Sequence, residues 1–348
     1  MRCLTRGRPF RIVPCLVAAA PFLVVGGCGD LLSPDQPGNL VPLTVDEDPS
    51  LPALALNGSL FHLEEAGLPG APVIVFLHGG PGGDYRSMRR LLQGHGGEPL
   101  TASHRVILWD QRSSGLSRRH DANEITIDLY TEDLLALTDY FSPNEPVVLV
   151  GHSWGGMYAT EFINRHPERV AGAVLIEPGP LTGERMKEIE DDYMSFDLTA
   201  EWLNDYAWSQ LFFTPDDHAR WDYQYALGYR DSQPKYYQDY SNDPAPYWRW
   251  GAAAGRYVEE DGLDENGDYA WDFTENLPAY SGDVLVIASG LNEVLGEAFQ
   301  LDQAEDFPRA EVVVVPDVGH DLEWKKAGEV LDLIRAYLAN MEFGEGPQ

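Results

Sequence analysis

The chain has 348 residues and a formal net charge of −32 at pH 7, from 24 basic and 56 acidic side chains. This length is sufficient to bury a substantial core, and so acidic a surface repels nucleic acids, so we expect no nucleic-acid partner. All three cysteines lie within the first 28 residues, which excludes disulfides, cysteine nucleophiles and cysteine-based zinc sites from the rest of the chain.

Residues 1–27 have the pattern of a secretory signal peptide. Four arginines and no acidic residue precede an apolar run from Ile12 to Val25. This run is interrupted by prolines and is shorter than the about 20 residues that a membrane-spanning helix needs. The ending Val25-Gly26-Gly27-Cys28 resembles the lipobox of bacterial lipoproteins. The resemblance implies acylation of Cys28 and an exported protein anchored to a membrane of the bacterial cell envelope, on its periplasmic or extracellular face. Simple cleavage of the signal, or a pro-segment, is the alternative.

Residues 28–53 follow as a linker. From residue 30 onward this segment contains five prolines and the acidic stretch Asp46-Glu47-Asp48, with little apolar periodicity. Such a composition predicts an extended spacer that holds a folded body away from a membrane surface.

Strand-like and helix-like segments alternate over residues 54–180 and again over residues 281–343. This alternation is typical of a mostly parallel α/β sheet with flanking crossover helices, here one domain interrupted by an insertion. The expected strands are 72–77, 106–109, 147–150, 170–176, 284–288 and 312–315, and the expected helices are 127–141, the segment after Ser153, and 323–338.

The insertion, residues 181–280, contains 22 of the 39 aromatic residues of the chain. We expect it to be a helical lid. Many of these rings must fill the small core of the lid itself. Together, however, a Tyr- and Trp-rich cover over a pocket favours an apolar or ring-containing substrate.

The segment Gly151-His152-Ser153-Trp154-Gly155 joins the buried strand 147–150 to the helix that follows. A tight turn at this point needs glycines on both sides, because larger side chains would collide with the neighbouring strand and helix. It would expose the hydroxyl group of Ser153 above the carboxyl edge of the sheet, at a helix N-terminus that favours developing negative charge. Ser153 is therefore the candidate nucleophile.

A serine nucleophile needs a base, and the base needs an acid. His320 lies on a loop just past the strand 312–315 and is the candidate base. Glu293 lies on the loop after the strand 284–288 and is the preferred acid, because it completes the chain order serine, acid, histidine. Glu177, directly after the strand 170–176, is the alternative acid. It would place the acid one strand earlier.

A glycine-rich loop, residues 78–83, follows the first buried strand. Its backbone can approach a substrate carbonyl closely, and we expect the N–H groups of Gly80 and Trp154 to form an oxyanion hole.

With these residues in place, the sequence resembles the proline iminopeptidase group of α/β-hydrolases, which are serine peptidases of the prolyl aminopeptidase type. The stretches that carry the resemblance are residues 78–83, 110–117 and 151–156. The resemblance implies release of an N-terminal residue, often proline, through an acyl-enzyme, and a structural role for Asp110 and Arg112 beside the oxyanion loop. The group usually has Asp at the position of Glu293 and more often Gly at that of His152.

A further difference concerns the substrate amine, which the group binds with lid glutamates. One of these follows a Trp pair, whereas Trp248-Arg249-Trp250 is followed here by Gly251. We therefore predict an α/β-hydrolase fold and a serine hydrolase without metal or cofactor, with a short peptide as first candidate substrate. A small ester or amide is the second. A lipoprotein that only binds a ligand in this pocket is the alternative from another class.

Overall fold

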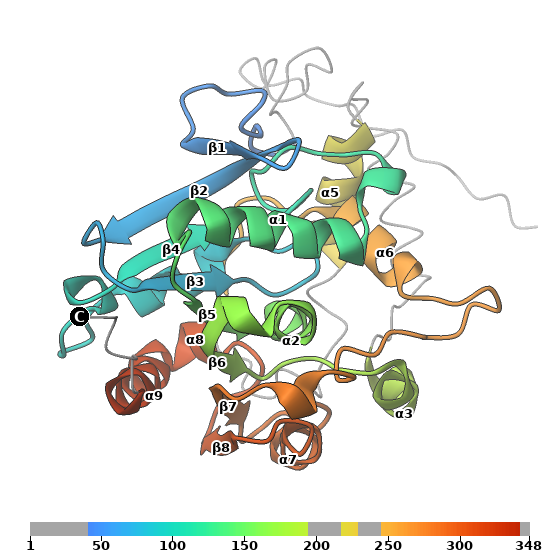
Figure 1. The fold of residues 1–348 in the computed structure, drawn as a ribbon. Coiled ribbons are helices and arrows are strands. Elements are labelled where there is room, and N and C mark those ends of the chain that lie inside the picture. The colour runs from blue at the N-terminus through green and yellow to red at the C-terminus, as the bar shows by residue number, and fades with distance from the viewer. Residues whose placement is uncertain (1–40, 194–216, 229–244, 342–348) are drawn as a thin grey trace, which may run out of the picture.

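The structure is a computed structural model that describes residues 41–193, 217–228 and 245–341. The predicted signal peptide and Cys28 lie outside these residues. An eight-stranded sheet forms the centre of the molecule, in the order β1-β2-β4-β3-β5-β6-β7-β8 (Figure 1). The strands are β1 (Ala53–Leu56), β2 (Ser59–Gly67), β3 (Val73–Leu77), β4 (Arg105–Trp109), β5 (Val147–His152), β6 (Val170–Ile176), β7 (Asp283–Ser289) and β8 (Ala310–Val315).

The strands from β3 to β8 are parallel, as the alternating sequence pattern predicts. Their central members are buried on both faces, so they are nearly continuous runs of Val, Ile and Leu. The hairpin of β1 and β2 was not predicted. Its second strand, β2, pairs antiparallel with β4 at one edge of the sheet. Both strands of the hairpin are partly exposed, and polar and apolar residues are mixed in their sequences.

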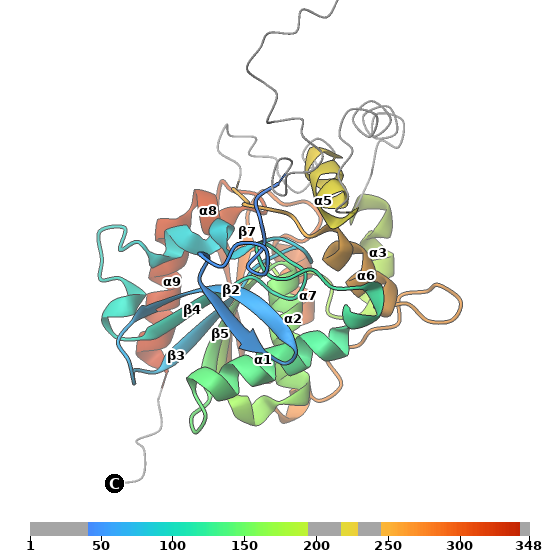
Figure 2. The same cartoon turned by 90° about the horizontal axis from the view of Figure 1, so that it is seen from above.

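Helices cover both faces of the sheet, and alternate residues of each strand pack into one layer or the other. In β3, Val73, Val75 and Leu77 belong to the core on the face of α1 (Ile127–Phe141) and α2 (Trp154–Arg165). Ile74 and Phe76 belong to the core on the opposite face, with η1 (Tyr85–Leu92), α8 (Leu322–Lys325) and α9 (Ala327–Asn340). Figure 2 shows the two layers on either side of the sheet. α7 (Glu297–Ala304) connects β7 to β8.

The last helical segment is divided. The sequence predicted one helix over residues 323–338, whereas the structure has α8 and α9 with a break at Lys326, where φ is −116° and ψ is 31°. The break lets α8 turn toward η1, where the guanidinium of Arg90 lies 3.6 Å from the ring centroid of Trp324.

The insertion lies beyond the carboxyl ends of the parallel strands. Its described part includes α3 (Gly183–Tyr193), α5 (Asp217–Gly228) and α6 (Ala252–Asp261), at the same end of the molecule in both views (Figures 1 and 2). It contacts the core closely, since the N–H of Gly251 donates to the carbonyl of Gly82 at 2.7 Å. None of the helices within the described ranges is long and apolar enough to cross a membrane.

The segment before β1 packs on the body instead of extending away from it. Val41, Thr44 and Val45 are buried, and the N–H of Val45 donates to the carbonyl of Leu116 at 2.8 Å. Residues 41–52 therefore differ from the extended spacer that the composition predicts, because their apolar residues find a place beside the loop of residues 110–117.

Candidate active site

Ser153 is the single residue between β5 and α2, and its backbone conformation is rare for residues other than glycine. Its φ is 54° and its ψ is −120°, which costs backbone strain of about 1–3 kcal/mol. The turn is possible only because its neighbours lack side chains: a Cβ on Gly155 would lie 2.0 Å from the carbonyl oxygen of Leu77. Ser153 itself is only partly buried. The predicted strand, sharp turn and helix are all present.

His320 lies on the loop after β8 and is 6% exposed. Its Nδ1 is 2.7 Å from Oε2 of Glu177. Glu177 directly follows β6, has a φ of 43° and is fully buried. It accepts further hydrogen bonds from the N–H of Ser289 at 2.9 Å, from Nδ2 of Asn292 at 3.0 Å and from the hydroxyl of Ser289. The side chain of Glu177 thus accepts four hydrogen bonds and donates none, which is the pattern of a carboxylate.

Glu293 does not take this position, so the structure contradicts the preferred acid and favours the alternative. The side chain of Glu293 is exposed, and the Nδ1 of His320 is occupied by Glu177. The residue before Glu293 faces inward instead: Asn292 donates to Glu177, while its Oδ1 accepts from the N–H groups of Val294 and Leu295. The loop after β7 therefore supplies donors to the acid and not the acid itself. The sequence contained one signal for this arrangement, the position of Glu177 immediately after a buried strand.

The turn of Ser153 and the loop of His320 meet through His152. The rings of His152 and His320 lie 4.8 Å apart between centroids and are tilted by 41°. Nε2 of His152 is 2.9 Å from the backbone carbonyl oxygen of His320. Since a carbonyl can only accept, this nitrogen carries the hydrogen. The contact brings the loop of His320 against the residue that precedes Ser153, although His320 lies 167 residues after Ser153 in the chain.

The glycine-rich loop lies against the serine turn from the other side. A Cβ on Gly79 would lie 3.2 Å from the Cβ of Ser153, and Gly80 has a φ of 134° that favours glycine. Among the described residues, neither the N–H of Gly80 nor that of Trp154 donates a hydrogen bond. Both N–H groups thus have no acceptor within this part of the chain, and their role as oxyanion donors stays a prediction.

The loop after β4 holds the glycine-rich loop in place. Gln111 accepts from the indole N–H of Trp154 at 2.9 Å and donates to the carbonyl of His78 at 3.0 Å. The backbone N–H of Gln111 in turn donates to Nε2 of His78 at 3.0 Å. Burial lowers the pKa of His78, so its ring is neutral and can accept this bond. The sequence alone gave no sign of the role of Gln111, which connects both sides of the predicted oxyanion hole.

Asp110 and Arg112 have structural partners, as the resemblance implied. Asp110 accepts from the backbone N–H groups of Tyr85 and Leu116 and from Nδ1 of His62, at 3.0, 2.8 and 2.7 Å. Arg112 binds both carboxylate oxygens of Asp133 at 2.7 Å. These buried contacts fix residues 110–117 beneath the glycine-rich loop.

The comparison with known families identifies this architecture. A family model described as "alpha/beta hydrolase fold" matches residues 72–327. The chain belongs to the α/β-hydrolase family. The family match and the similarity to known hydrolases together show that the protein is a hydrolase.

Relatives with several activities resemble this α/β-hydrolase. A probable proline iminopeptidase of Leptolyngbya boryana is 26% identical over 313 residues, which cover 82% of this chain and 91% of that protein. A cis-3-alkyl-4-alkyloxetan-2-one decarboxylase of Shewanella oneidensis is 25% identical over 296 residues, or 83% and 88% of the two chains. The structure of a proline iminopeptidase-related protein from Thermus thermophilus has a TM-score of 0.56 at 20% identity and covers 84% of this chain and 97% of that one. Identity at this level between structures establishes the fold alone.

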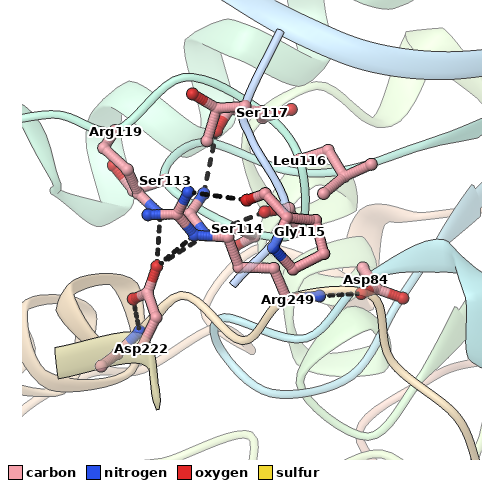
Figure 3. Close-up of polar contacts among 12 residues, drawn as sticks. Asp84, Ser113, Ser114, Gly115, Leu116, Ser117, Arg119, Asp222 and Arg249 are labelled. Carbon is pink, nitrogen blue, oxygen red and sulfur yellow. Dashed lines mark hydrogen bonds and ion pairs between the residues drawn. The ribbon is translucent and has the colours of Figure 1, made fainter. Parts of the chain in front are cut away.

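A polar cluster connects the insertion of the α/β-hydrolase to its core (Figure 3). Asp222 on α5 accepts from Nε of Arg119 at 3.0 Å, from Nε of Arg249 at 2.7 Å and from the N–H of Ala252 at 2.9 Å. Asp84 accepts from the N–H groups of Trp248 and Arg249 at 2.6 and 3.1 Å. Both carboxylates at this junction are therefore committed to partners within the protein. The described ranges contain no group of three or more His, Cys, Asp or Glu side chains suited to a metal ion.

Proposed function

We propose that this α/β-hydrolase is a serine hydrolase that cleaves an acyl bond through an acyl-enzyme. The observation that carries the proposal is the buried contact of 2.7 Å between His320 and Glu177, beside a serine in a strained turn. Ser153 is the nucleophile, His320 the base and Glu177 the acid. The N–H groups of Gly80 and Trp154 are the oxyanion donors.

The chemistry follows from these positions. His320 takes the proton of the Ser153 hydroxyl as the oxygen attacks the acyl carbon, and Glu177 stabilises the imidazolium that forms. The negative charge on the former carbonyl oxygen is stabilised by the two N–H groups, each worth about 3 kcal/mol. His320 then returns the proton to the leaving group, and a water molecule activated by the same ring hydrolyses the acyl-enzyme.

A short peptide with a free amine is the first candidate substrate. The support is the similarity to proline iminopeptidases in the stretches 78–83, 110–117 and 151–156 and over most of the chain. The acidic composition of the chain also favours a cationic ligand.

A small ester or amide is the second candidate, and the junction between the insertion and the core favours it. The proline iminopeptidase group has a lid glutamate after its Trp pair, but Gly251 cannot be replaced by a larger residue here. A Cβ at this position would lie 2.0 Å from the carbonyl oxygen of Ser113. Asp84 and Asp222, the nearby buried acids, already bind backbone N–H groups and arginines.

The two candidates, and the ligand-binding alternative, are separated by two measurements on the full-length protein. A fluorophosphonate probe is expected to label the wild type but not Ser153→Ala, and no labelling of the wild type would favour the ligand-binding protein. Proline and alanine p-nitroanilides are then compared with p-nitrophenyl esters of increasing chain length. Ester turnover without anilide turnover would contradict the peptidase.

We also propose that the protein is exported and acylated at Cys28, on the sequence pattern alone. Expression of the wild type and of Cys28→Ser in a bacterial host with labelled palmitate is expected to label only the wild type. Equal labelling, or none, would contradict the anchor.

A further inference from the structure

A carboxyl group without a hydrogen bond lies behind His320. Glu323, in the first turn of α8, has no exposed surface, and within the described residues neither of its carboxyl oxygens has a hydrogen-bond partner. Its Oε2 is 3.3 Å from Nε2 of His152, close enough for an electrostatic contact but not aligned as a hydrogen bond. Burying an unsatisfied carboxyl is costly, so its presence beside the candidate base requires an explanation.

His152 occupies the space between this carboxyl and the active site. It directly precedes Ser153, its ring lies against that of His320, and its Nε2–H donates to the His320 carbonyl at 2.9 Å. The same nitrogen faces Glu323. The serine turn after β5 and the histidine loop after β8 are thus connected at one ring nitrogen.

Burial favours the neutral form of both members of this pair. Burial, followed by the charge of Asp321, raises the pKa of Glu323 well above its ordinary value. The residue's own backbone N–H opposes this, the charge of Glu177 adds to it, and Lys325 opposes it more weakly. Burial, followed by the charges of His320 and His78, lowers the pKa of His152.

We propose that His152 and Glu323 are positioning residues for His320. The His152–Glu323 pair is a neutral imidazole and carboxylic acid that fixes the backbone of His320 relative to Ser153 without adding charge. This inference rests on the proposed function, because positioning has a kinetic consequence only if Ser153 and His320 carry the reaction. A displacement of about 1 Å at a reacting group can lower the rate about 100-fold.

Variants that keep or remove one hydrogen-bonding group test the pair. His152→Phe keeps a ring but removes the donor, whereas Gln places an amide N–H near the position of Nε2. His152→Phe is expected to lower kcat by about 10- to 100-fold with KM unchanged, and His152→Gln should retain activity within about threefold. Glu323→Leu is expected to lower kcat by about tenfold, and Glu323→Gln to retain it. Glu329→Gln, on the exposed face of α9, is the matched control and should leave kcat unchanged.

The acid limb of the kcat/KM profile separates positioning from a structural role. It reports the pKa of the base, and it should shift in His152→Phe but not in Glu329→Gln. If His152→Phe and Glu323→Leu lower only the melting temperature, with kcat and the acid limb as in the wild type, the inference is wrong. A wild type that the fluorophosphonate probe does not label would instead overturn the proposed function itself.

A measurement on the wild type keeps the inference testable if His152→Phe does not fold. Nitrogen NMR of the histidine rings, with the His152 signals assigned from their absence in His152→Gln, should find the neutral tautomer with hydrogen on Nε2 at pH 7. A hydrogen on Nδ1 would contradict it, since Nε2 could not then donate to the carbonyl of His320.

Discussion

Two buried glutamates contact the two neighbouring histidines, Glu177 at His320 and Glu323 at His152, and they differ in how their carboxyl groups are satisfied. Glu177 accepts from Ser289, Asn292 and His320, whereas Glu323 has no hydrogen-bond partner within the described ranges. Both are fully buried. Burial by itself therefore does not decide the charge of a carboxyl group: donors around Glu177 stabilise the carboxylate, and their absence around Glu323 leaves the neutral acid favoured.

Replacement of Glu177 should have the largest effect on activity. Glu177→Gln keeps the shape of the side chain but presents an amide to Nδ1 of His320, which disfavours the tautomer that the base requires. We expect kcat to fall about 10³- to 10⁴-fold, measured on the best ester or anilide substrate.

Glu293→Gln is the control that decides between the two predicted acids. Glu293 is exposed, so this variant should retain kcat within about twofold, in keeping with ordinary surface substitutions. A large loss in Glu293→Gln together with a small one in Glu177→Gln would restore the acid that the sequence favoured.

Removal of one donor to Glu177 should have a smaller effect. Asn292→Ala deletes a hydrogen bond of 3.0 Å to the carboxylate, and a bond to a charged group contributes about 1.5–3 kcal/mol. Because Ser289 continues to donate, we expect kcat to fall about tenfold. Asn266→Ala, in an exposed turn, should leave kcat unchanged, and an equal loss in both variants would contradict the role of Asn292.

The sequence was sufficient to predict the parallel strands and the serine turn, because both depend on local patterns. Runs of Val, Ile and Leu define strands buried on both faces, and Gly151 and Gly155 are required by contacts within a few residues of Ser153 or with the next strand. The hairpin of β1 and β2 lacked such a pattern. Its residues are partly exposed, so no continuous apolar run marks the two strands in the sequence.

The acid could not be decided from the sequence because two strand ends offered a glutamate. Glu177 and Glu293 both follow a buried strand and both precede His320 in the chain. The difference between them depends on which side chain faces inward from the loop after β7. Asn292 does so because its Oδ1 accepts from the next backbone N–H groups, and Glu293 is then directed to solvent. Gln111 and Glu323 were missed for a similar reason, since the partners of Gln111 and the contact of Glu323 with His152 come from distant segments.

The smallest expected effect is on stability, and it tests whether the two glutamates differ in charge. The pKa of Glu323 is raised from its ordinary value of 4.5 in the folded protein, so above pH 4.5 the folded state binds more protons at this group than the unfolded state does. Its contribution to the free energy of unfolding therefore falls as the pH rises from 4.5 toward the raised pKa. Glu323→Gln removes this titration, and its melting temperature relative to the wild type should increase between pH 5 and pH 8.

The expected gain at pH 8 is about 1 kcal/mol, because the buried amide of Gln also lacks a full set of partners. For a domain of this size that corresponds to about 2 °C. Glu329→Gln changes a carboxylate that forms an exposed contact with Lys326, so its melting temperature should differ from the wild type by the same small amount at both pH values. A difference between Glu323→Gln and the wild type that is independent of pH would mean that Glu323 is ionised in the folded state. The two glutamates would then not differ in charge, and the neutral pair behind His320 would have to be abandoned.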